Sequence, residues 1–194
     1  MRWTRAAGAA GLSCLLALTA SCQSREAKVD QTPLPTAAAP PFICDYVPLK
    51  AVELMTGETN PLVRGGFSFD RPSGLGDGGC AVYQRDGDQL KVLQIVLVPM
   101  GGEARVRDQL SIGASPLPTI VPDAIGYYGN NSSIKHNSAH AILARGDAEL
   151  VIKLEEGVKG RDNAADVVAL MKLIAPKLIK SDSTPTLTPS ATKG

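Results

Sequence analysis

The segment from residue 88 to residue 99 constrains the fold more than any other part of the chain. In an extended backbone its apolar side chains point to both sides: Leu90, Val92, Val96 and Val98 form one set, and Leu93, Ile95 and Leu97 form the other. A strand that is apolar on both sides belongs inside a sheet whose two faces are partly covered. Residues 80–85 and Asp86-Gly87 precede it, and Asp-Gly favours the positive φ angles of a tight turn. A central hairpin is therefore predicted.

Other segments predict the rest of an α+β domain. Strands are expected within 64–79, around 125–128, and at 138–145 and 148–155, and helices at about 47–56, at 103–110 and from residue 162 or 163 onward. The last helix carries apolar residues at three- and four-residue spacing, Asp162 or Asn163 is its expected cap, and Pro176 is expected to break or kink its last turn. These elements predict an antiparallel sheet of about five or six strands, covered mainly by the long C-terminal helix.

The first 21 residues have the three parts of a secretion signal, with Arg2 and Arg5 before a small and apolar stretch. That stretch is shorter than the roughly 20 residues that a membrane-spanning helix needs. Thr19, Ala20 and Ser21 then precede Cys22 as in a lipoprotein signal, with Thr at the usual Leu place. We expect cleavage before Cys22 and lipid modification of that cysteine, which would anchor the chain to the extracytoplasmic face of the cell membrane. The alternative is that Cys22 is an ordinary cysteine of a leader.

The remaining chain predicts one domain between two irregular ends. Residues 22–41 are rich in proline and predict a flexible tether, residues 42–180 hold the α+β domain, and residues 181–194 have the Ser/Thr/Pro composition of a disordered tail. Removal of the signal leaves 18 basic residues against 19 acidic ones, so no electrostatic feature indicates a nucleic-acid partner. With aromatic residues at only 4%, an aromatic stacking platform is not expected.

Two cysteines remain for the folded part. Cys14 leaves with the signal and Cys22 carries the lipid, so Cys44 and Cys80 have a single pairing available. Outside the cytoplasm such a pair is expected to oxidise. A redox-active pair would need a thiolate-stabilising setting such as Cys-x-x-Cys, which is absent here. We therefore predict a structural Cys44–Cys80 disulfide.

The sequence contains no recognisable catalytic or metal-binding motif. The only histidines, His136 and His140, would share one face of a helix, but in an extended segment they lie about 13 Å apart, too far to share an ion. No carboxylate or cysteine cluster accompanies them, and no GxSxG motif surrounds Ser132 or Ser133. We predict no metal, no cofactor and no catalytic residue, and interpret the histidines as surface or loop residues.

One segment has the composition of a recognition loop. Tyr127 and Tyr128 are followed closely by Asn130 and Asn131, and tyrosine with asparagine is typical of binding loops. The alternative interpretation is a hairpin tip with one tyrosine buried.

The chain resembles a family of secreted actinobacterial lipoproteins whose two-cysteine domain is catalogued as a domain of unknown function. The likeness covers about residues 42–179 and depends on short motifs. These are the lipoprotein signal and proline-rich tether, Cys44-Asp45 before a short helix ending at Gly57, Cys80-Ala81-Val82-Tyr83, Pro122-Asp123-Ala124 and the closing Ala/Leu-rich helix. The resemblance implies a disulfide between the two cysteines and an α+β module similar to the PsbP/Mog1-type sandwich, and it implies no catalytic residues.

Three functions compete at this point. The first is a non-enzymatic binding or accessory module of the cell envelope, held to the membrane by its lipid, whose partner is an envelope lipid, a cell-wall component or a protein. The second is a small extracytoplasmic hydrolase with an unrecognised Ser/His site near His136 and His140. The third is a spacer or sensor element of a membrane complex.

Overall fold

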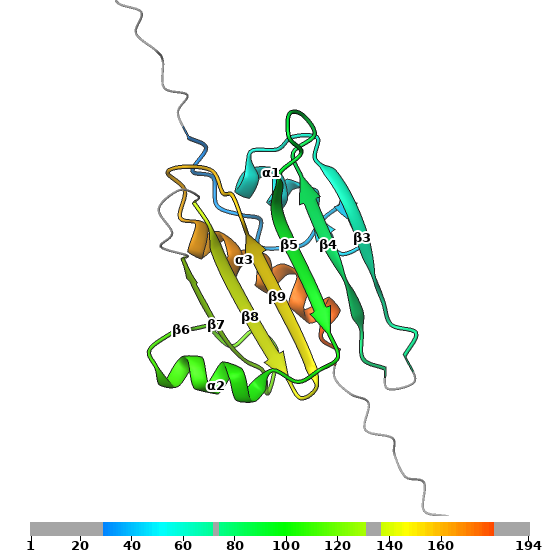
Figure 1. Ribbon diagram of the computed structural model, residues 1–194, viewed down its shortest axis with the longest axis vertical. Helices are drawn as coiled ribbons and strands as arrows, with labels where there is room; N and C mark the ends of the chain where they lie inside the picture. Colours follow the sequence, from blue (N-terminus) through cyan, green and yellow to red (C-terminus); the bar gives the residue numbers. More distant parts are fainter. Residues whose placement is uncertain (1–28, 72–73, 131–136, 181–194) are drawn as a thin grey trace, which may run out of the picture.

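The computed structural model describes residues 29–71, 74–130 and 137–180, and its largest element is a seven-stranded antiparallel sheet (Figure 1). The strand order is β3-β4-β5-β9-β8-β7-β6. The strands are β3 (Leu62–Ser68), β4 (Asp77–Tyr83), β5 (Lys91–Val98), β6 (Ser115–Pro116), β7 (Ile125–Asn130), β8 (Ala139–Arg145) and β9 (Ala148–Leu154). A separate small sheet pairs β1 (Phe42–Ile43) with β2 (Val47–Pro48). The α+β class is confirmed, and the sheet is larger than the predicted five or six strands because the two-residue β6 adds to it.

In the described part of the chain, three helices cover the sheet unequally. The helices α1 (Leu49–Thr56) and α3 (Asn163–Leu178) pack on one face, whereas α2 (Glu103–Ser111) contacts β7 and β8 from the other face. Figure 1 shows α3 behind the sheet and α2 in front of its lower end. One face is therefore covered along its length and the other only in part.

The central strand β5 confirms the two-sided pattern of the sequence from Leu93 to Val98. Val92, predicted to lie with Val96, is instead 1% exposed in the main core, and Leu90 precedes the strand at 50% exposure. Leu93, Ile95 and Leu97 are at most 1% exposed and belong to the core beneath α3. Val96 and Val98, which point to the opposite face, are only partly buried. The strand lies between β4 and β9, in the interior of the sheet as predicted.

Two hairpins of the sheet differ in their turns. The strands expected at 138–145 and 148–155 form one hairpin, in which Arg145 pairs with Ala148 and Gly146-Asp147 forms a tight two-residue turn. At the central hairpin the strands end at Tyr83 and resume at Lys91, with the Gln84 N–H donating to the Leu90 carbonyl at 2.9 Å. The prediction of a tight two-residue turn at Asp86-Gly87 is therefore wrong, and a longer connection joins the two strands.

Helix α3 starts at one of the two expected caps and continues past Pro176. The Asp162 carboxylate accepts a hydrogen bond from the Ala165 N–H at 3.0 Å, which identifies Asp162 as the cap. The helix continues through Pro176 to Leu178. A proline so near the end removes one backbone hydrogen bond, while Leu178 and Ile179 stay at most 2% exposed and keep this end packed. Of the two predicted effects of Pro176, a break or a kink, the break is therefore wrong.

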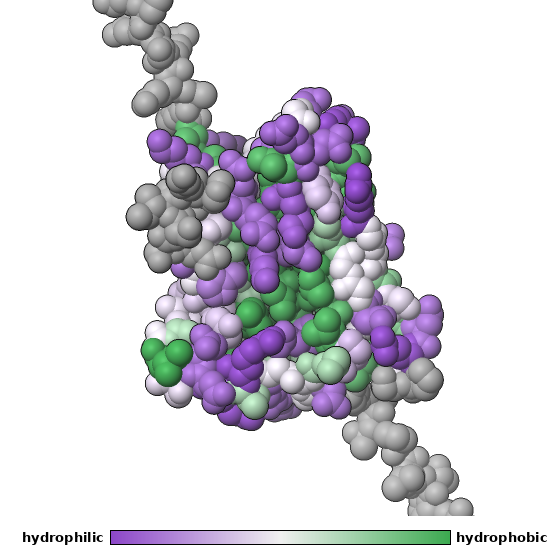
Figure 2. Space-filling model, in the orientation of Figure 1, coloured by the Kyte–Doolittle hydropathy of each residue, from purple (hydrophilic) through white to green (hydrophobic). Residues whose placement is uncertain are grey.

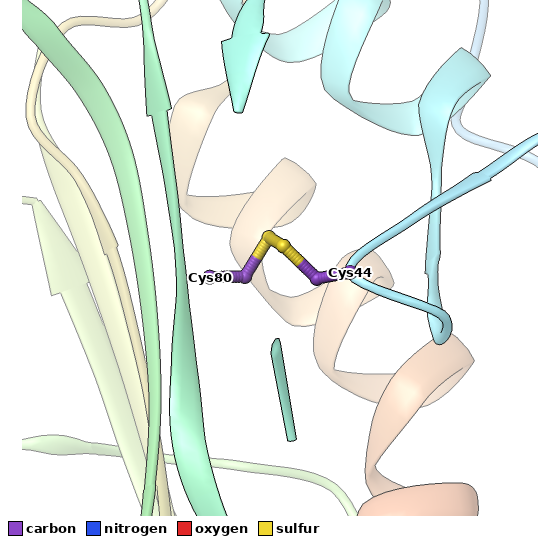
Figure 3. Close-up of a disulfide and its surroundings, with 2 residues drawn as sticks. All are labelled: Cys44 and Cys80. Carbon is purple, nitrogen blue, oxygen red and sulfur yellow. A yellow bond between two sulfur atoms is a disulfide. The ribbon is translucent and has the colours of Figure 1, made fainter. Parts of the chain in front are cut away.

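The Cys44–Cys80 disulfide is present, with a Cα–Cα distance of 5.9 Å (Figure 3). Cys80 lies in β4 and points into the core at 1% exposure, whereas Cys44 lies in the turn between β1 and β2. The bond therefore fastens the small N-terminal sheet to the large sheet across a sequence separation of 36 residues.

Residues 29–41, which we call the strap, lie against the domain. Leu34 is 6% exposed, and the Gln31 side chain donates to the Gly160 carbonyl at 2.8 Å. Arg161 donates to the Thr32 carbonyl at 3.1 Å and also to the Asp30 carbonyl. The flexible tether predicted for residues 22–41 is thus corrected for residues 29–41, while residues 22–28 and the predicted tail 181–194 lie outside the described residues. None of the helices in the described ranges is both long enough and apolar enough to cross a bilayer.

Candidate functional site on the open sheet face

The face opposite α3, which we call the open face, carries a line of uncharged residues across the strands. In sheet order the line consists of Gly66, Gly79, Val96, Val151, Ile142 and Tyr127, each paired with the next in the register of the sheet. We call this line the apolar row. Because side chains alternate along a strand, the neighbours Ile95 and Ile152 point into the core and the row points away from it.

The middle of the apolar row is accessible. Tyr127 and Ile142 are each 9% exposed and pack with Val106 of α2 in a second, smaller core. Val96 and Val151 are only partly buried, and Val151 lies at the edge of this smaller core. Figure 2 shows apolar surface in the middle of this face, bordered above and below by hydrophilic side chains. Val96 of β5 and Val151 of β9 thus form an accessible apolar surface next to α2.

Two cations stand beside the row without a carboxylate partner. Lys153 of β9 and Arg64 of β3 are both exposed, each next to the row on its own strand, and neither forms an ion pair within the described ranges. The Arg64 guanidinium instead lies 5.3 Å from the centre of the Tyr83 ring. Their positive charge is therefore available to an incoming group.

On the other side of the row the carboxylate of Glu149 is paired with an arginine. Glu149 of β9 is 2% exposed and accepts a hydrogen bond from Arg105 of α2. Glu103, also on α2, accepts a hydrogen bond from the Gly146 N–H at 2.7 Å. Both contacts fix the first turn of α2 to the β8–β9 hairpin, so the position of this helix beside Val96 and Val151 is fixed.

His140 is the one histidine within the described residues, and it lies on β8 two positions before Ile142 of the apolar row. Its ring is 5.7 Å from the Tyr127 ring in an edge-to-face arrangement. Burial, and then the positive charge of Lys153, lower the pKa of His140 below its ordinary value of 6.5, while burial raises the pKa of Tyr127 above 10.0. Both side chains are therefore uncharged at neutral pH.

The geometry assembles no catalytic pair around His140. Within the described ranges its side chain forms no hydrogen bond to a serine or a carboxylate, and no group of three His, Cys, Asp or Glu residues could hold a metal ion. His136, Ser132 and Ser133 lie outside the described residues. The contact that the structure gives to His140 is an aromatic packing contact.

The residues of the predicted recognition loop do not form a loop. Tyr127, Tyr128 and Asn130 belong to strand β7, and Asn131 lies outside the described residues. Alternation along the strand sends Tyr127 beneath α2 and Tyr128 to the face that packs against the main core. Asn130 is exposed at the end of β7. The alternative with one buried tyrosine is closer to the structure, since Tyr127 is the buried one.

Val96 and Val151 are the site residues that the sequence did not identify. The sequence pattern gave part of this information, because it placed Val96 on the face of the strand opposite Ile95. Which of the apolar side chains stay accessible depends on where α2 packs, and that contact is set by the tertiary structure.

The known protein families, curated proteins and solved structures contain no match to this chain, so the likeness to the actinobacterial lipoproteins stays a prediction.

Proposed function

We propose that this protein is a membrane-anchored extracytoplasmic lipoprotein that acts as a non-enzymatic binding or accessory module of the cell envelope, with the apolar row as its binding surface. The observation that carries this proposal is the uncovered part of the open face. There, accessible valines of β5 and β9 adjoin two cations, Lys153 and Arg64, that form no ion pair with any described residue.

The chemistry of the face favours a partner that is apolar and negatively charged. Burial of apolar surface contributes about 25 cal/mol per Å². Complementary charge adds specificity and accelerates association, and Lys153 and Arg64 would supply it. The backbone groups of β5 and β9 are used in the sheet, so recognition depends on these side chains. An envelope lipid, an acidic cell-wall component and a protein with an acidic, apolar surface all meet this description.

The anchor is supported by the sequence of the signal and by Cys22. A diacylglyceryl group together with an N-acyl chain supplies the two or more chains that stable membrane attachment needs. We also propose a relationship to the PsbP/Mog1-type sandwich, supported by the packing of α3 on an antiparallel sheet.

Photo-crosslinking in intact membranes tests the binding surface. A photoreactive amino acid replaces Gln94, which pairs with Lys153 on the open face, or, as a control, Lys172, which is exposed on α3 on the opposite side. We expect covalent adducts from position 94 and none from position 172. The additional substitution Val151→Asp places a charge in the apolar row and should abolish the adducts from position 94.

Equal adducts from both positions, or adducts that survive Val151→Asp, would reject the open face as the binding surface. The anchor is tested separately by the mass of the purified protein, which should show a lipid on a chain that begins at Cys22. The variant Cys22→Ser should lack that lipid and leave the membrane fraction.

A further inference from the structure

The strap is fastened to the domain through the buried side chain of Arg161, which is 4% exposed. The Arg161 guanidinium donates to both carboxylate oxygens of Asp166, each at 2.8 Å, so the charge is paired inside the protein. The same guanidinium donates to the backbone carbonyls of Asp30 and Thr32. Arg161 therefore joins the first turn of α3 to a chain segment about 130 residues away in sequence.

Further contacts hold the strap in the same place. The Gln31 side chain reaches the Gly160 carbonyl, and Leu34 is 6% exposed among the core residues. Within the strap, the Asp30 carboxylate accepts a hydrogen bond from the Thr32 N–H at 2.9 Å. Hydrogen bonding to the Thr32 side chain, and then to its N–H, lowers the pKa of Asp30 below 3.8. Polar and apolar contacts thus both favour the docked strap.

The strap leaves the domain at one defined end. Val29 lies next to Gly160, where an added Cβ would be 3.5 Å from the Val29 side chain. Gly160 follows the end of β9 at Leu154, whereas Asp147 precedes the start of that strand. Figure 1 shows the start of the strap, in blue, at the end of the molecule away from α2 and from the β8–β9 turn.

Docking of the strap shortens the connection to Cys22. Seven residue steps separate Cys22 from Val29, which span at most about 25 Å even when fully extended. If the strap were free, the connection would run to Phe42 and could reach about 70 Å. A connection of about 70 Å is longer than a domain of this size, so any side of the domain could face the membrane. A connection of at most about 25 Å is shorter than the domain and keeps the end at Val29 near the membrane.

We infer that the strap orients the anchored domain, with the end that carries residues 155–161 facing the lipid bilayer and with α2 and the β8–β9 turn directed away from it. The open face then stands at the side of the anchored molecule, where a partner can reach it. This inference rests on the proposed anchor at Cys22, and it adds a membrane-facing surface to the binding surface.

Energy transfer to the bilayer tests the orientation. The only tryptophan of the chain is Trp3, within the signal, so a single tryptophan can be introduced at Lys159 or at Asp147, which are both exposed. Strand β9 separates these positions by about 20 Å. The lipidated chain is placed in phosphatidylcholine vesicles that contain a dansyl lipid as acceptor. We expect more efficient transfer from position 159 than from position 147.

Two variants release the strap from opposite sides. Arg161→Ala removes the bonds to the strap together with the countercharge of Asp166, whereas Leu34→Asp weakens strap packing and leaves the Arg161–Asp166 pair intact. In both variants the difference in transfer between positions 159 and 147 should disappear. If Arg161→Ala fails to fold, Leu34→Asp alone decides the question. Equal transfer from the two positions in the parent chain, or a difference that survives Leu34→Asp, would overturn the inference.

A separate attachment distinguishes failure of the anchor from failure of the orientation. If the purified chain carries no lipid, the proposed anchoring fails. A maleimide lipid is then coupled to Cys22 of a chain produced without residues 1–21, in which Cys44 and Cys80 are bonded to each other. The same comparison of positions 159 and 147 then gives a result for the strap alone.

Discussion

Gly102 lies directly against the carboxylate of Glu149, such that a Cβ added at residue 102 would be 1.5 Å from Oε2 of Glu149. Glu149 is 2% exposed, and while its Oε1 accepts a hydrogen bond from Arg105, its Oε2 has no hydrogen-bond partner in the described part of the chain. The start of α2 therefore fits onto β9 without room for a side chain at residue 102.

The substitution Gly102→Ala should destabilise the protein by about 2 kcal/mol or more, because either the buried carboxylate or the start of α2 must move. The measurement is the free energy of unfolding from a urea titration. Gly66→Ala in β3 is the matched control, since its Cβ would have no atom within 4 Å. That control should change stability by less than about 0.5 kcal/mol. Equal losses in both variants would contradict the close fit at Glu149.

Arg105 and Arg107 occupy the same helix and should differ in their contributions to stability. Arg105→Ala leaves Glu149 buried without a countercharge and should cost about 2 kcal/mol, less than for a fully buried pair because the Arg105 side chain is 60% exposed. Arg107→Ala removes only an exposed pair with Glu103 and should cost at most about 0.5 kcal/mol. Urea titrations of both variants give the comparison, and similar losses would argue against a structural role for the Glu149 contact.

Local patterns predicted much of this fold because they express properties of single elements. The alternation on both sides of residues 90–98 predicted an interior strand, and β5 lies between β4 and β9. The three- and four-residue apolar spacing predicted α3, whose apolar face is buried against the sheet. A two-residue strand such as β6 is too short to show an alternating pattern, so the predicted number of strands was too small.

The features that position the site depend on contacts between distant residues. The contact of Arg161 with Asp30 spans 131 residues, and no local pattern distinguishes this arginine from an exposed one. The proline-rich composition of the strap predicts a segment that does not pack into a core, yet its Leu34 is 6% exposed and packs among the core residues. The apolar row likewise appears only when the register of six strands is known.

His140 should make the protein less stable under mildly acidic conditions. Its pKa in the folded protein is lowered by burial and by Lys153, its partner on β9, so the unfolded chain binds the proton more strongly. The stabilising contribution is fully present above pH 6.5 and is lost as the pH falls from 6.5 through the folded-state pKa. In His140→Gln this part of the pH dependence should be absent. Parallel pH profiles of unfolding free energy for the two proteins would show that His140 titrates normally in the fold.

Reduction of the Cys44–Cys80 disulfide should lower the free energy of unfolding by about 3 to 4 kcal/mol, because the bond closes a loop with a sequence separation of 36 residues in the unfolded chain. Urea titrations with and without a reductant measure the loss. The double variant Cys44→Ala with Cys80→Ala should match the reduced parent chain, apart from a small further loss because Cys80 is 1% exposed in the core. The double variant should also no longer respond to the reductant. If the reductant leaves the parent chain unchanged, the bond contributes little to stability, and the contacts between the strap and α3 must hold the N-terminal segment instead.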